Sequence, residues 1–367
     1  MSEQASEVGN ALLSWYDRNH RVLPWRIAPA DRARGIQPSA YHVWLSEIML
    51  QQTTVRAVQP YFLKFVSRWP NVTALAAEKD DEIMRAWAGL GYYSRARNLK
   101  KCAERVAFEL GGIFPADVEE LKKLPGIGDY TAAAIAAIAF GRRAAVVDGN
   151  IERVVARLEQ IETPLPAAKS AIKKRMYAFT PGERPGDFAQ AMMDLGATIC
   201  TPKRPACGLC PVSSACSAGG TGEAEKLPVK QAKKPRPVRR GAAFVAVAED
   251  NSILLRKRPG SGLLGGMAEV PTSGWNAKCD GALGAAAAPF AGDWQMAGTI
   301  THVFTHFELR LDVYHADFAL RPQVDEGWWS PQRELSEEAL PTVMKKAIAA
   351  AMESTQRKSR PGQGTLI

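Results

Sequence analysis

Four of the six cysteines lie close together along the chain, and these are Cys200, Cys207, Cys210 and Cys216. Their spacing is C-x6-C-x2-C-x5-C, and thiolates this close in sequence can converge on one soft metal centre. Two kinds of centre fit, a structural zinc ion and a [4Fe–4S] cluster. Zinc sites usually pair two C-x2-C segments, whereas this chain has one between unequal arms. The spacing therefore favours the cluster, in a structural role.

Two carboxylates have surroundings that suit acid–base chemistry. Glu47 lies in the apolar stretch 44–53, and a glutamate on an apolar helix face is seldom buried without a partner or a role. Burial would raise its pKa and keep it available as a general acid; the alternative is a glutamate on the solvent face. Asp148, in the stretch 146–153, is either a functional carboxylate or the N-cap of a helix, a position that aspartate favours.

A short segment with two glycines, residues 124–131, joins two stretches with helical periodicity. Gly126 and Gly128 allow a tight turn whose N–H groups point outward together, and at a helix N-terminus such a turn binds an anion. The segment resembles a helix-hairpin-helix that contacts a DNA phosphate, and an ordinary helix connection is the alternative. Asp129 argues against a phosphate at this place unless its carboxylate points away.

Length and composition indicate a folded protein of two domains. The 367 residues are 46% hydrophobic and 23% charged, which excludes collagen-like and wholly disordered chains. The net charge of +9 favours a polyanionic partner, although only weakly. No apolar window reaches the ~18–20 residues of a membrane span. The first residues are too acidic for a signal or transit peptide, so we expect a cytoplasmic protein.

The elements that must position these residues fall into two parts with different periodicity. Residues 12–199 are mostly helical, with predicted helices at 41–52, 81–87, 97–110, 130–140 and 150–158. From residue 241 the pattern becomes strand-like, at 243–247, 252–255, 298–304 and 307–314, before a helix at 341–352. We therefore predict a multidomain chain: an all-α domain (1–225), a basic, proline-rich linker (226–240), an α+β domain (241–353) and a disordered tail (354–367).

Several motifs together resemble those of the MutY-type adenine DNA glycosylases, of the helix-hairpin-helix DNA glycosylase superfamily. They are residues 23–26 (LPWR), 46–53 (SEIMLQQT), 89–95 (GLGYYSR), the hairpin, 147–150 (VDGN) and the four-cysteine spacing. The resemblance covers nearly the whole chain. It implies an all-α glycosylase domain with an iron–sulfur cluster loop, followed by an α+β Nudix-like domain, and it favours [4Fe–4S] over zinc. The implied reaction is hydrolysis of the N-glycosidic bond of adenine mispaired with 8-oxoguanine or guanine, in base excision repair.

The resemblance also implies roles for residues of the first domain. Glu47 matches the acid that protonates adenine at N7, and Asp148 matches the carboxylate that stabilises the oxocarbenium-like sugar, as in glycoside hydrolysis. Asn150 and Tyr130 match residues that support this site. The positions that match contacts to the flipped adenine or to the gap and lesion partner are Arg26, Gln52, Thr53, Leu90, Tyr92 and Gln190. Adenine has to leave the duplex to be reached, and a mispaired base costs less to flip.

Tyr130 distinguishes this chain from glycosylases that also cut the strand. Those relatives carry lysine at this point of the hairpin and form a Schiff base, which tyrosine cannot do. We therefore expect a monofunctional, hydrolytic glycosylase rather than an endonuclease III-type enzyme for oxidised pyrimidines. The other alternative, a non-catalytic DNA-binding or redox protein, would need neither Glu47 nor Asp148.

In the family, the second domain resembles the Nudix fold and recognises 8-oxoguanine. Phe304, Thr305 and His306 match the loop that probes the lesion, with threonine in place of the usual serine. Residues 333–338 look like part of a Nudix hydrolase box. The glycine and the further glutamate that the box needs upstream are replaced, so we expect no Mg²⁺-dependent hydrolysis.

Two further segments suggest partners. Six basic linker residues are either solvated or contact phosphate: Lys230, Lys233, Lys234, Arg236, Arg239 and Arg240. Residues 363–367 resemble the short peptides that dock on bacterial sliding clamps. We expect a monomer without a membrane partner. It should bind double-stranded DNA that contains 8-oxoguanine:A or G:A mispairs, in the cytoplasm and on the nucleoid.

Overall fold

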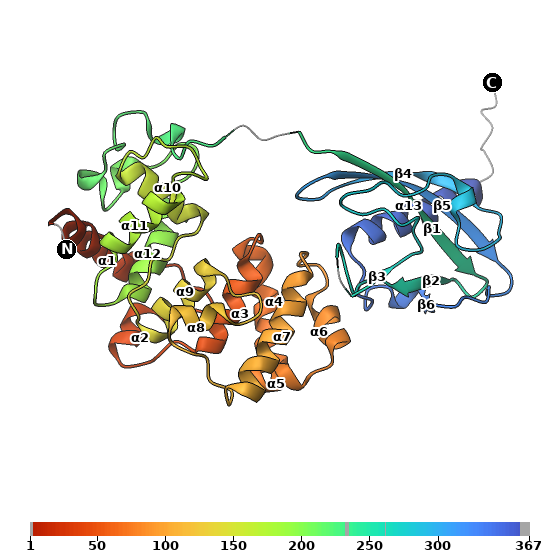
Figure 1. Cartoon of the computed structure of the whole chain (residues 1–367), viewed down its shortest axis with the longest axis horizontal. Coiled ribbons are helices and arrows are strands. Elements are labelled where there is room, and N and C mark those ends of the chain that lie inside the picture. Colours follow the sequence, from red (N-terminus) through yellow and green to blue (C-terminus); the bar gives the residue numbers. More distant parts are fainter. Residues whose placement is uncertain (1–2, 232–234, 261, 360–367) are drawn as a thin grey trace, which may run out of the picture. The chain divides into compact units, whose positions relative to one another are not determined.

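The computed structural model describes residues 3–231, 235–260 and 262–359. Contacts divide the chain into two compact units (Figure 1). The first comprises Met1–Glu78 and Asn98–Lys233, and the second comprises Lys79–Arg97 and Lys234–Ile367. None of the described helices has the length and apolar character needed to span a bilayer.

The N-terminal part of the chain is helical, as the periodicity predicts. In chain order the helices are α1 (Glu3–Asn19), α2 (Pro29–Ala33), α3 (Ala40–Leu50), α4 (Val55–Arg68), α5 (Val72–Ala77), α6 (Asp80–Trp87), α7 (Ser94–Glu109), α8 (Val118–Lys122), α9 (Asp129–Phe140), α10 (Gly149–Leu158), α11 (Lys169–Phe179) and α12 (Pro185–Thr198). The predicted helices correspond to α3, α6, α7, α9 and α10. Two 3₁₀ turns, Cys207–Leu209 and Ser213–Ala215, follow in the cysteine loop.

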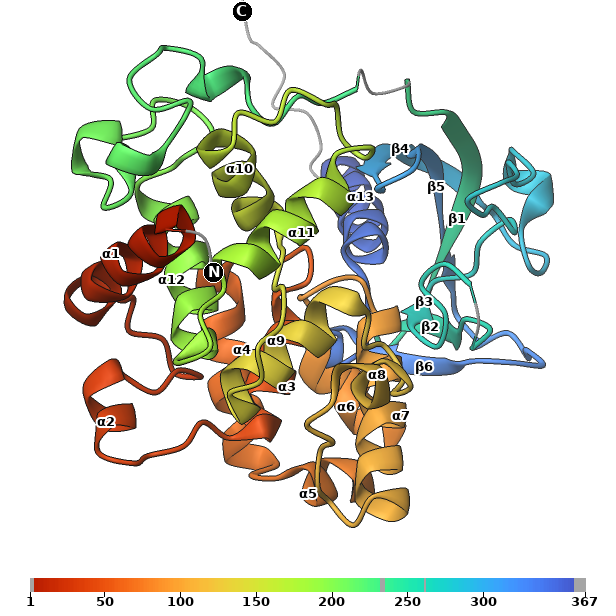
Figure 2. The same ribbon diagram turned by 60° about the vertical axis from the view of Figure 1, so that its left-hand side comes forward.

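The centre of the first unit is built from helices that approach one another closely. α9 is rich in alanine, and its residues 131–138 are all buried. α3 and α12 pack against α9, and α10 packs against α12 (Figure 2). The approach of α12 depends on glycine, since a Cβ on Gly186 would lie 2.5 Å from the carbonyl oxygen of Ala137. These four helices carry or flank the predicted catalytic residues.

The second unit contains a mixed sheet packed against α13 (Thr342–Ser359). Its strands are β1 (Val238–Ala248), β2 (Ser252–Lys257), β3 (Ala268–Glu269), β4 (Gln295–Val303), β5 (Glu308–Phe318) and β6 (Trp328–Pro331). The strand order is β3-β2-β1-β5-β4, and β6 also pairs with β2. β1 and β5 are parallel, and the other pairs are antiparallel. The predicted order of an all-α part followed by an α+β part is confirmed.

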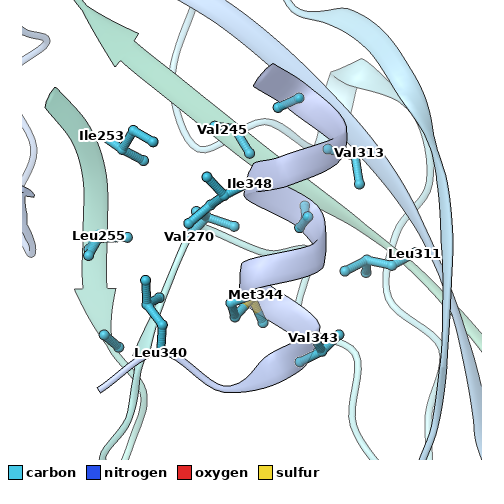
Figure 3. Close-up of a cluster of buried hydrophobic side chains, with 14 of the residues drawn as sticks. Val245, Ile253, Leu255, Val270, Leu311, Val313, Leu340, Val343, Met344 and Ile348 are labelled. Carbon is cyan, nitrogen blue, oxygen red and sulfur yellow. The ribbon is translucent and has the colours of Figure 1, made fainter. Parts of the chain in front are cut away.

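A hydrophobic core between α13 and the sheet holds the second unit together (Figure 3). Val343, Met344 and Ile348 of α13 belong to it, at the spacing of one helical face. On β5, residues 309, 311 and 313 are buried in the same cluster, which is the period of two expected of a strand with one face on the core. The apolar face of the predicted helix and the apolar face of the predicted strand therefore pack together in this core.

Two boundaries differ from those expected. β1 begins at Val238, inside the stretch predicted to be linker, because residues 238–240 pair with the start of β5. The start of the predicted linker is also bonded to the first unit, because Leu165 N donates to Val229 O at 2.8 Å. α13 continues to Ser359, into the stretch expected to be a disordered tail. The first helix breaker after that helix is Pro361, which explains why the helical pattern persists.

Candidate active site

A cavity of about 720 Å³ lies in the first unit. Its walls come from the segment between α1 and α2, from α3 and the turn that follows it, and from α9, α10 and α12. The predicted site residues on these walls are Arg26, Glu47, Gln52, Thr53, Tyr130, Asp148, Asn150 and Gln190. The volume is within the range of about 300–1,000 Å³ typical of ligand pockets. The fold therefore brings together chemistry-bearing residues that lie far apart in the sequence.

Glu47 is buried, as one of the two interpretations of the sequence proposed. The residue is 6% exposed and lies on α3. Burial raises the pKa of its carboxyl to about 7; a hydrogen bond with Tyr130 opposes the rise, the charge of Asp148 adds to it, and Arg26 opposes it. Among the described atoms, Glu47 Oε2 has no hydrogen-bond partner. A carboxyl that is protonated near neutral pH, with one oxygen available in a cavity, can give a proton to a bound base.

Tyr130 supports this acid. It is the second residue of α9 and shares a side-chain hydrogen bond with Glu47. Burial raises the pKa of its hydroxyl well above the usual value, and the charges of Glu47 and Asp148 add to the rise. The hydroxyl therefore remains protonated at neutral pH and acts as a hydrogen-bond donor.

Asp148 is both the N-cap of α10 and a residue of the cavity wall. Its Oδ1 accepts a hydrogen bond from Ile151 N at 2.7 Å, and its Oδ2 accepts one from Asn150 Nδ2 at 3.0 Å. Burial raises the pKa of its carboxyl, and these hydrogen bonds oppose the rise. The cap predicted from the sequence is confirmed, and it holds the carboxylate at the cavity.

Arg153, which the sequence analysis did not single out, continues this network toward the cysteine loop. Its Nη2 donates to Asn150 Oδ1 at 3.0 Å and to Gly196 O at 2.6 Å. Its Nε donates to Cys200 O at 2.7 Å. Arg153 follows Asn150 by three positions on the same helix, so the two side chains share one face. That spacing was the available signal.

Arg26 is held at the cavity by Asp194, a second residue that the sequence did not identify. Arg26 Nη1 donates to both carboxylate oxygens of Asp194, at 2.9 and 2.8 Å. Gln190 is 3% exposed and precedes Asp194 by four positions on α12, so one face of this helix carries both. The two residues predicted to contact adenine, Arg26 and Gln190, therefore lie on the same cavity.

The hairpin forms the predicted connection between α8 and α9. Gly126 has a φ of +78°, which favours glycine, and a Cβ there would lie 2.8 Å from a side-chain carbon of α7. Gly128 is the N-cap of α9. The carboxylate of Asp129 pairs with Lys122 Nζ at 3.1 Å and with Lys173 Nζ at 3.6 Å. These two lysines offset the charge of the Asp129 carboxylate, so Asp129 argues less strongly against a phosphate at the hairpin.

The four predicted metal ligands surround one cavity of about 30 Å³. All four cysteines are half-buried, and none forms a disulfide. Arg157 is 2% exposed, and its Nη1 lies 3.3 Å from Cys200 Sγ. In the described ranges, no group of three or more Cys, His, Asp or Glu is arranged to hold a single metal ion. A buried cation beside four converging thiols offsets thiolate charge, which fits a metal–sulfur centre.

The predicted lesion loop forms the turn between β4 and β5. Phe304 N donates to Phe307 O at 2.9 Å, and the two rings stack with their centroids 4.7 Å apart. Thr305 and His306 are exposed at the tip. The stacked aromatic pair therefore supports two polar side chains that face solvent.

The remaining predicted contacts stay predictions. Tyr92 is 48% exposed, whereas Leu90 is buried at 6% exposure, although a wedge between bases would need its apolar surface. Two basic linker residues, Lys233 and Lys234, lie outside the described residues, as does the clamp-like segment 363–367.

A hairpin between two helices, beside a cavity with a protonatable glutamate and a capped aspartate, defines a class: the base-excision DNA glycosylases. Residues 45–178 match the profile of the HhH-GPD superfamily of base excision DNA repair proteins, and residues 242–350 match that of the NUDIX domain. The chain is 36% identical over 402 residues to an adenine DNA glycosylase of Homo sapiens, covering 92% of this chain and 72% of that one. It therefore belongs to the adenine DNA glycosylase family, whose members hydrolyse an N-glycosyl bond.

Two further similarities agree with this assignment. An adenine DNA glycosylase of Rattus norvegicus is 36% identical over 408 residues, which cover 92% of this chain and 76% of the relative. Among solved structures, a thermostable thymine-DNA glycosylase is 28% identical, with a TM-score of 0.52 over 60% of this chain and 98% of that protein. The 60% covered is less than the whole chain, as expected if only the helical part is shared.

Proposed function

We propose that this protein is a monofunctional glycosylase that removes adenine mispaired with 8-oxoguanine or guanine. The observation that carries the proposal is the placement of Glu47, with a pKa of about 7, in the same cavity as the capped carboxylate of Asp148. One group can donate a proton while the other remains available as an anion. When the surroundings push the pKa values of two neighbouring carboxyls apart, one can act as the acid and the other as the anionic stabiliser.

The reaction follows from these roles. Adenine rotates out of the duplex into the cavity, where protonated Glu47 gives its proton to N7. The bond between the sugar C1′ and adenine N9 breaks, and its electron pair leaves with the base. Asp148 stabilises the positive charge on the sugar. Water then adds at C1′ and gives one proton to the deprotonated Glu47, which leaves an abasic site. Tyr130 keeps Glu47 in place through their hydrogen bond, and Asn150 orients Asp148.

The proposal excludes an intrinsic lyase. A lyase of this superfamily needs an amine at the hairpin to form a Schiff base with the sugar. Tyr130 occupies that position and shares a hydrogen bond with Glu47. The abasic product should therefore leave the enzyme with its strand intact.

Recognition of 8-oxoguanine is proposed for the turn between β4 and β5. The exposed hydroxyl of Thr305 and the ring of His306 can form hydrogen bonds with the lesion, and Phe304 can contact its face. DNA binding is proposed for the hairpin and the basic linker, with Gln52 and Thr53 beside the gap left by the base. A monomer in the cytoplasm, with clamp docking through residues 363–367, completes this part of the proposal.

The cysteine loop is proposed to hold a [4Fe–4S] cluster. Cys200, Cys207, Cys210 and Cys216 would be its ligands, and the buried Arg157 would offset their charge. When bound, the cluster would cross-link the loop from Cys200, just after α12, to Cys216, and Arg157 of α10 already donates to Thr201 O and Pro202 O of this loop. An iron and sulfide assay of protein purified without oxygen tests this, and a metal content of one zinc per chain would contradict it.

The decisive experiment uses a duplex with one 8-oxoguanine:A pair, under single-turnover conditions, with and without alkali after the reaction. Strand breaks that appear only after alkali would support a monofunctional adenine glycosylase. Breaks without alkali would show that the argument from Tyr130 is wrong. No breaks under either condition, from protein with its metal centre intact, would favour a DNA-binding role without catalysis. A duplex with 8-oxoguanine opposite cytosine is the matched control and should remain uncut.

A further inference from the structure

Asp194 is a buried carboxylate directly behind the wall of the active-site cavity. It lies on α12 with no exposed side-chain surface, and it is not among the residues that line the cavity. Four hydrogen bonds converge on it, all from the short segment between α1 and α2. Arg21 donates from its backbone N at 2.9 Å and from Nε at 2.6 Å, and Arg26 Nη1 donates to both oxygens at 2.9 and 2.8 Å.

The segment that Asp194 holds has little regular structure of its own. Residues 20–28 contain no helix or strand, so their position depends on side-chain anchors. Trp25 packs edge-on against Phe62, with ring centroids 5.3 Å apart, which anchors one side. Asp194 anchors the other side through charge-assisted hydrogen bonds, which are shorter and stronger than neutral ones. Because a buried carboxylate is costly unless paired, the pairing with two arginines is strongly specified.

Both arginines line the cavity, and Arg26 is the one whose charge acts on Glu47. Its side chain is 7% exposed and lines the cavity with Glu47. Nη1 makes both bonds to Asp194, and the guanidinium carries further N–H donors on Nε and Nη2 that a ligand in the cavity could use. Adenine presents ring nitrogens that accept such donors. The place of this guanidinium therefore affects both the bound base and the acid beside it.

We propose that Asp194 is a positioning residue of the active site. It fixes the Arg26 guanidinium on the cavity wall and offsets part of the charge that Arg21 and Arg26 bring there. This inference rests on the proposed function, since it assigns Asp194 a role in the same cavity. Asp194 touches neither the base nor the sugar, and it acts through the two arginines, chiefly through Arg26.

The charge of Asp194 should affect the pKa of Glu47, which a purely structural residue would not do. Two arginines and one aspartate carry a net charge of +1, and replacing Asp194 by asparagine makes it +2. The charged or titratable groups that act on Glu47 are Tyr130, Asp148 and Arg26, and Arg26 already lowers the pKa of Glu47. With Asp194 neutral, Arg26 should lower that pKa further, because less of its charge is offset.

The test compares Asp194→Asn with Asp187→Asn, a matched control on the same helix. Asp187 is also buried and also binds two arginines, Arg32 at 3.0 Å and Arg184 at 2.9 Å, but neither of these lines the catalytic cavity. Single-turnover rates on the 8-oxoguanine:A duplex are measured from pH 5 to 9 for the wild type and both variants. Thermal unfolding is measured in parallel to compare the stability cost of the two changes.

The expected result is specific to Asp194→Asn. Its rate should fall about 10- to 100-fold, because small displacements in an active site have effects of this size. The alkaline fall in rate, expected near pH 7 in the wild type, should move to lower pH. Asp187→Asn should lose similar stability and leave the pH profile unchanged. Equal rate losses for both variants, or an alkaline fall that stays in place in Asp194→Asn, would overturn the inference.

A double-mutant cycle separates this role from others. In an Arg26→Met background, Asp194→Asn should have little further effect on the rate, because the two residues act as one unit. Full additivity would overturn the inference even if the single variant were slow. If the wild type released no adenine, or if Glu47→Gln remained fully active, the proposed function would fail and this inference with it. Failure confined to the Asp194 variants would remove the inference alone.

Discussion

Glu47 and Asp148 show how two carboxylates on one cavity can have different surroundings. Glu47 is buried with one oxygen that has no partner among the described atoms, and its pKa rises to about 7. Asp148 is also buried in part, but backbone and side-chain hydrogen bonds favour its charged form. Both carboxyls line one cavity, so their different pKa shifts reflect their hydrogen-bond partners as well as their depth of burial.

Replacing Glu47 by glutamine should nearly abolish base release. The amide keeps the size of the side chain but has no acidic proton, and general acids contribute about 100- to 10,000-fold to such rates. Single-turnover cleavage of the 8-oxoguanine:A duplex measures the loss. Glu109→Gln, at an exposed glutamate at the end of α7, is the control and should match the wild type. A Glu47→Gln rate within threefold of the wild type would assign the acid elsewhere.

The same substitution should stabilise the protein at alkaline pH. The pKa of the Glu47 carboxyl is near 4.5 in the unfolded chain and about 7 in the folded chain. Between these pH values the folded chain therefore binds a proton that the unfolded chain has lost. The free energy of unfolding that depends on this group therefore falls as pH rises from 4.5 to 7. In urea titrations, the advantage of Glu47→Gln over the wild type should grow by about 2 kcal/mol between pH 5 and pH 8. An advantage that is equal at both values would contradict the raised pKa.

At the scale of elements, the position of the Asp148 carboxylate depends on the contact between α10 and α12. Arg153 donates to Gly196 O across this contact and to Asn150 Oδ1 on its own helix. The helices meet closely, and a Cβ on Gly196 would lie 2.7 Å from the Cβ of Asn150. Any expansion at this point moves Asn150, and through it Asp148.

We therefore expect Gly196→Ala to reduce catalysis more than it reduces DNA binding. Overpacking of this kind costs about 1–3 kcal/mol of stability and displaces the neighbouring backbone. The single-turnover rate should fall at least about tenfold, since reacting groups tolerate little displacement. Affinity for the mispaired duplex should change by less. Gly182→Ala, where a Cβ meets nothing within 4 Å, is the matched control. Equal effects of the two substitutions would show that the contact with Asn150 is unimportant.

At the scale of the whole molecule, the candidate catalytic cavity and the proposed lesion loop belong to different units. Every residue that lines the catalytic cavity lies in the first unit, and the turn with Thr305 and His306 lies in the second. Each unit has its own core, of packed helices in one case and of a sheet with α13 in the other. The ability to release adenine should therefore be separable from the preference for its partner.

A chain that ends at residue 231 tests this separation. It should still release adenine opposite guanine, because the cavity is complete, but its preference for 8-oxoguanine:A over G:A should fall at least about tenfold, or about 1.4 kcal/mol. The measurement is the ratio of single-turnover efficiencies on the two duplexes, with circular dichroism to verify that the fragment is folded. A folded fragment with an unchanged preference would place lesion recognition in the first unit. The full-length His306→Ala variant is the companion test and should lose part of the same preference.

The sequence by itself determined the features that depend on local pattern. Helical and strand periodicity, the hairpin glycines and the cysteine spacing identified the two parts of the chain, the hairpin and the cysteine loop, because these signals lie within one element or one loop. Glu47 and Asp148 were singled out by their own surroundings, whereas the other predicted residues of the cavity came from the resemblance to a known family. Even the capping role of Asp148 was visible, since a cap acts only a few residues away.

The tertiary structure decided what depends on residues distant in the chain. Whether Glu47 was buried or on the surface could not be read from α3 alone, because the helices that cover it come later. The sequence analysis did not identify Arg153 and Asp194, because helix packing determines their partners. Arg26 and Asp194, for example, are separated by 168 positions. Likewise, the lysines that pair with Asp129 come from α8 and α11. The sequence gives the chemical type of each side chain. Its burial and its hydrogen-bond and ion-pair partners are determined only when elements distant in the chain pack together.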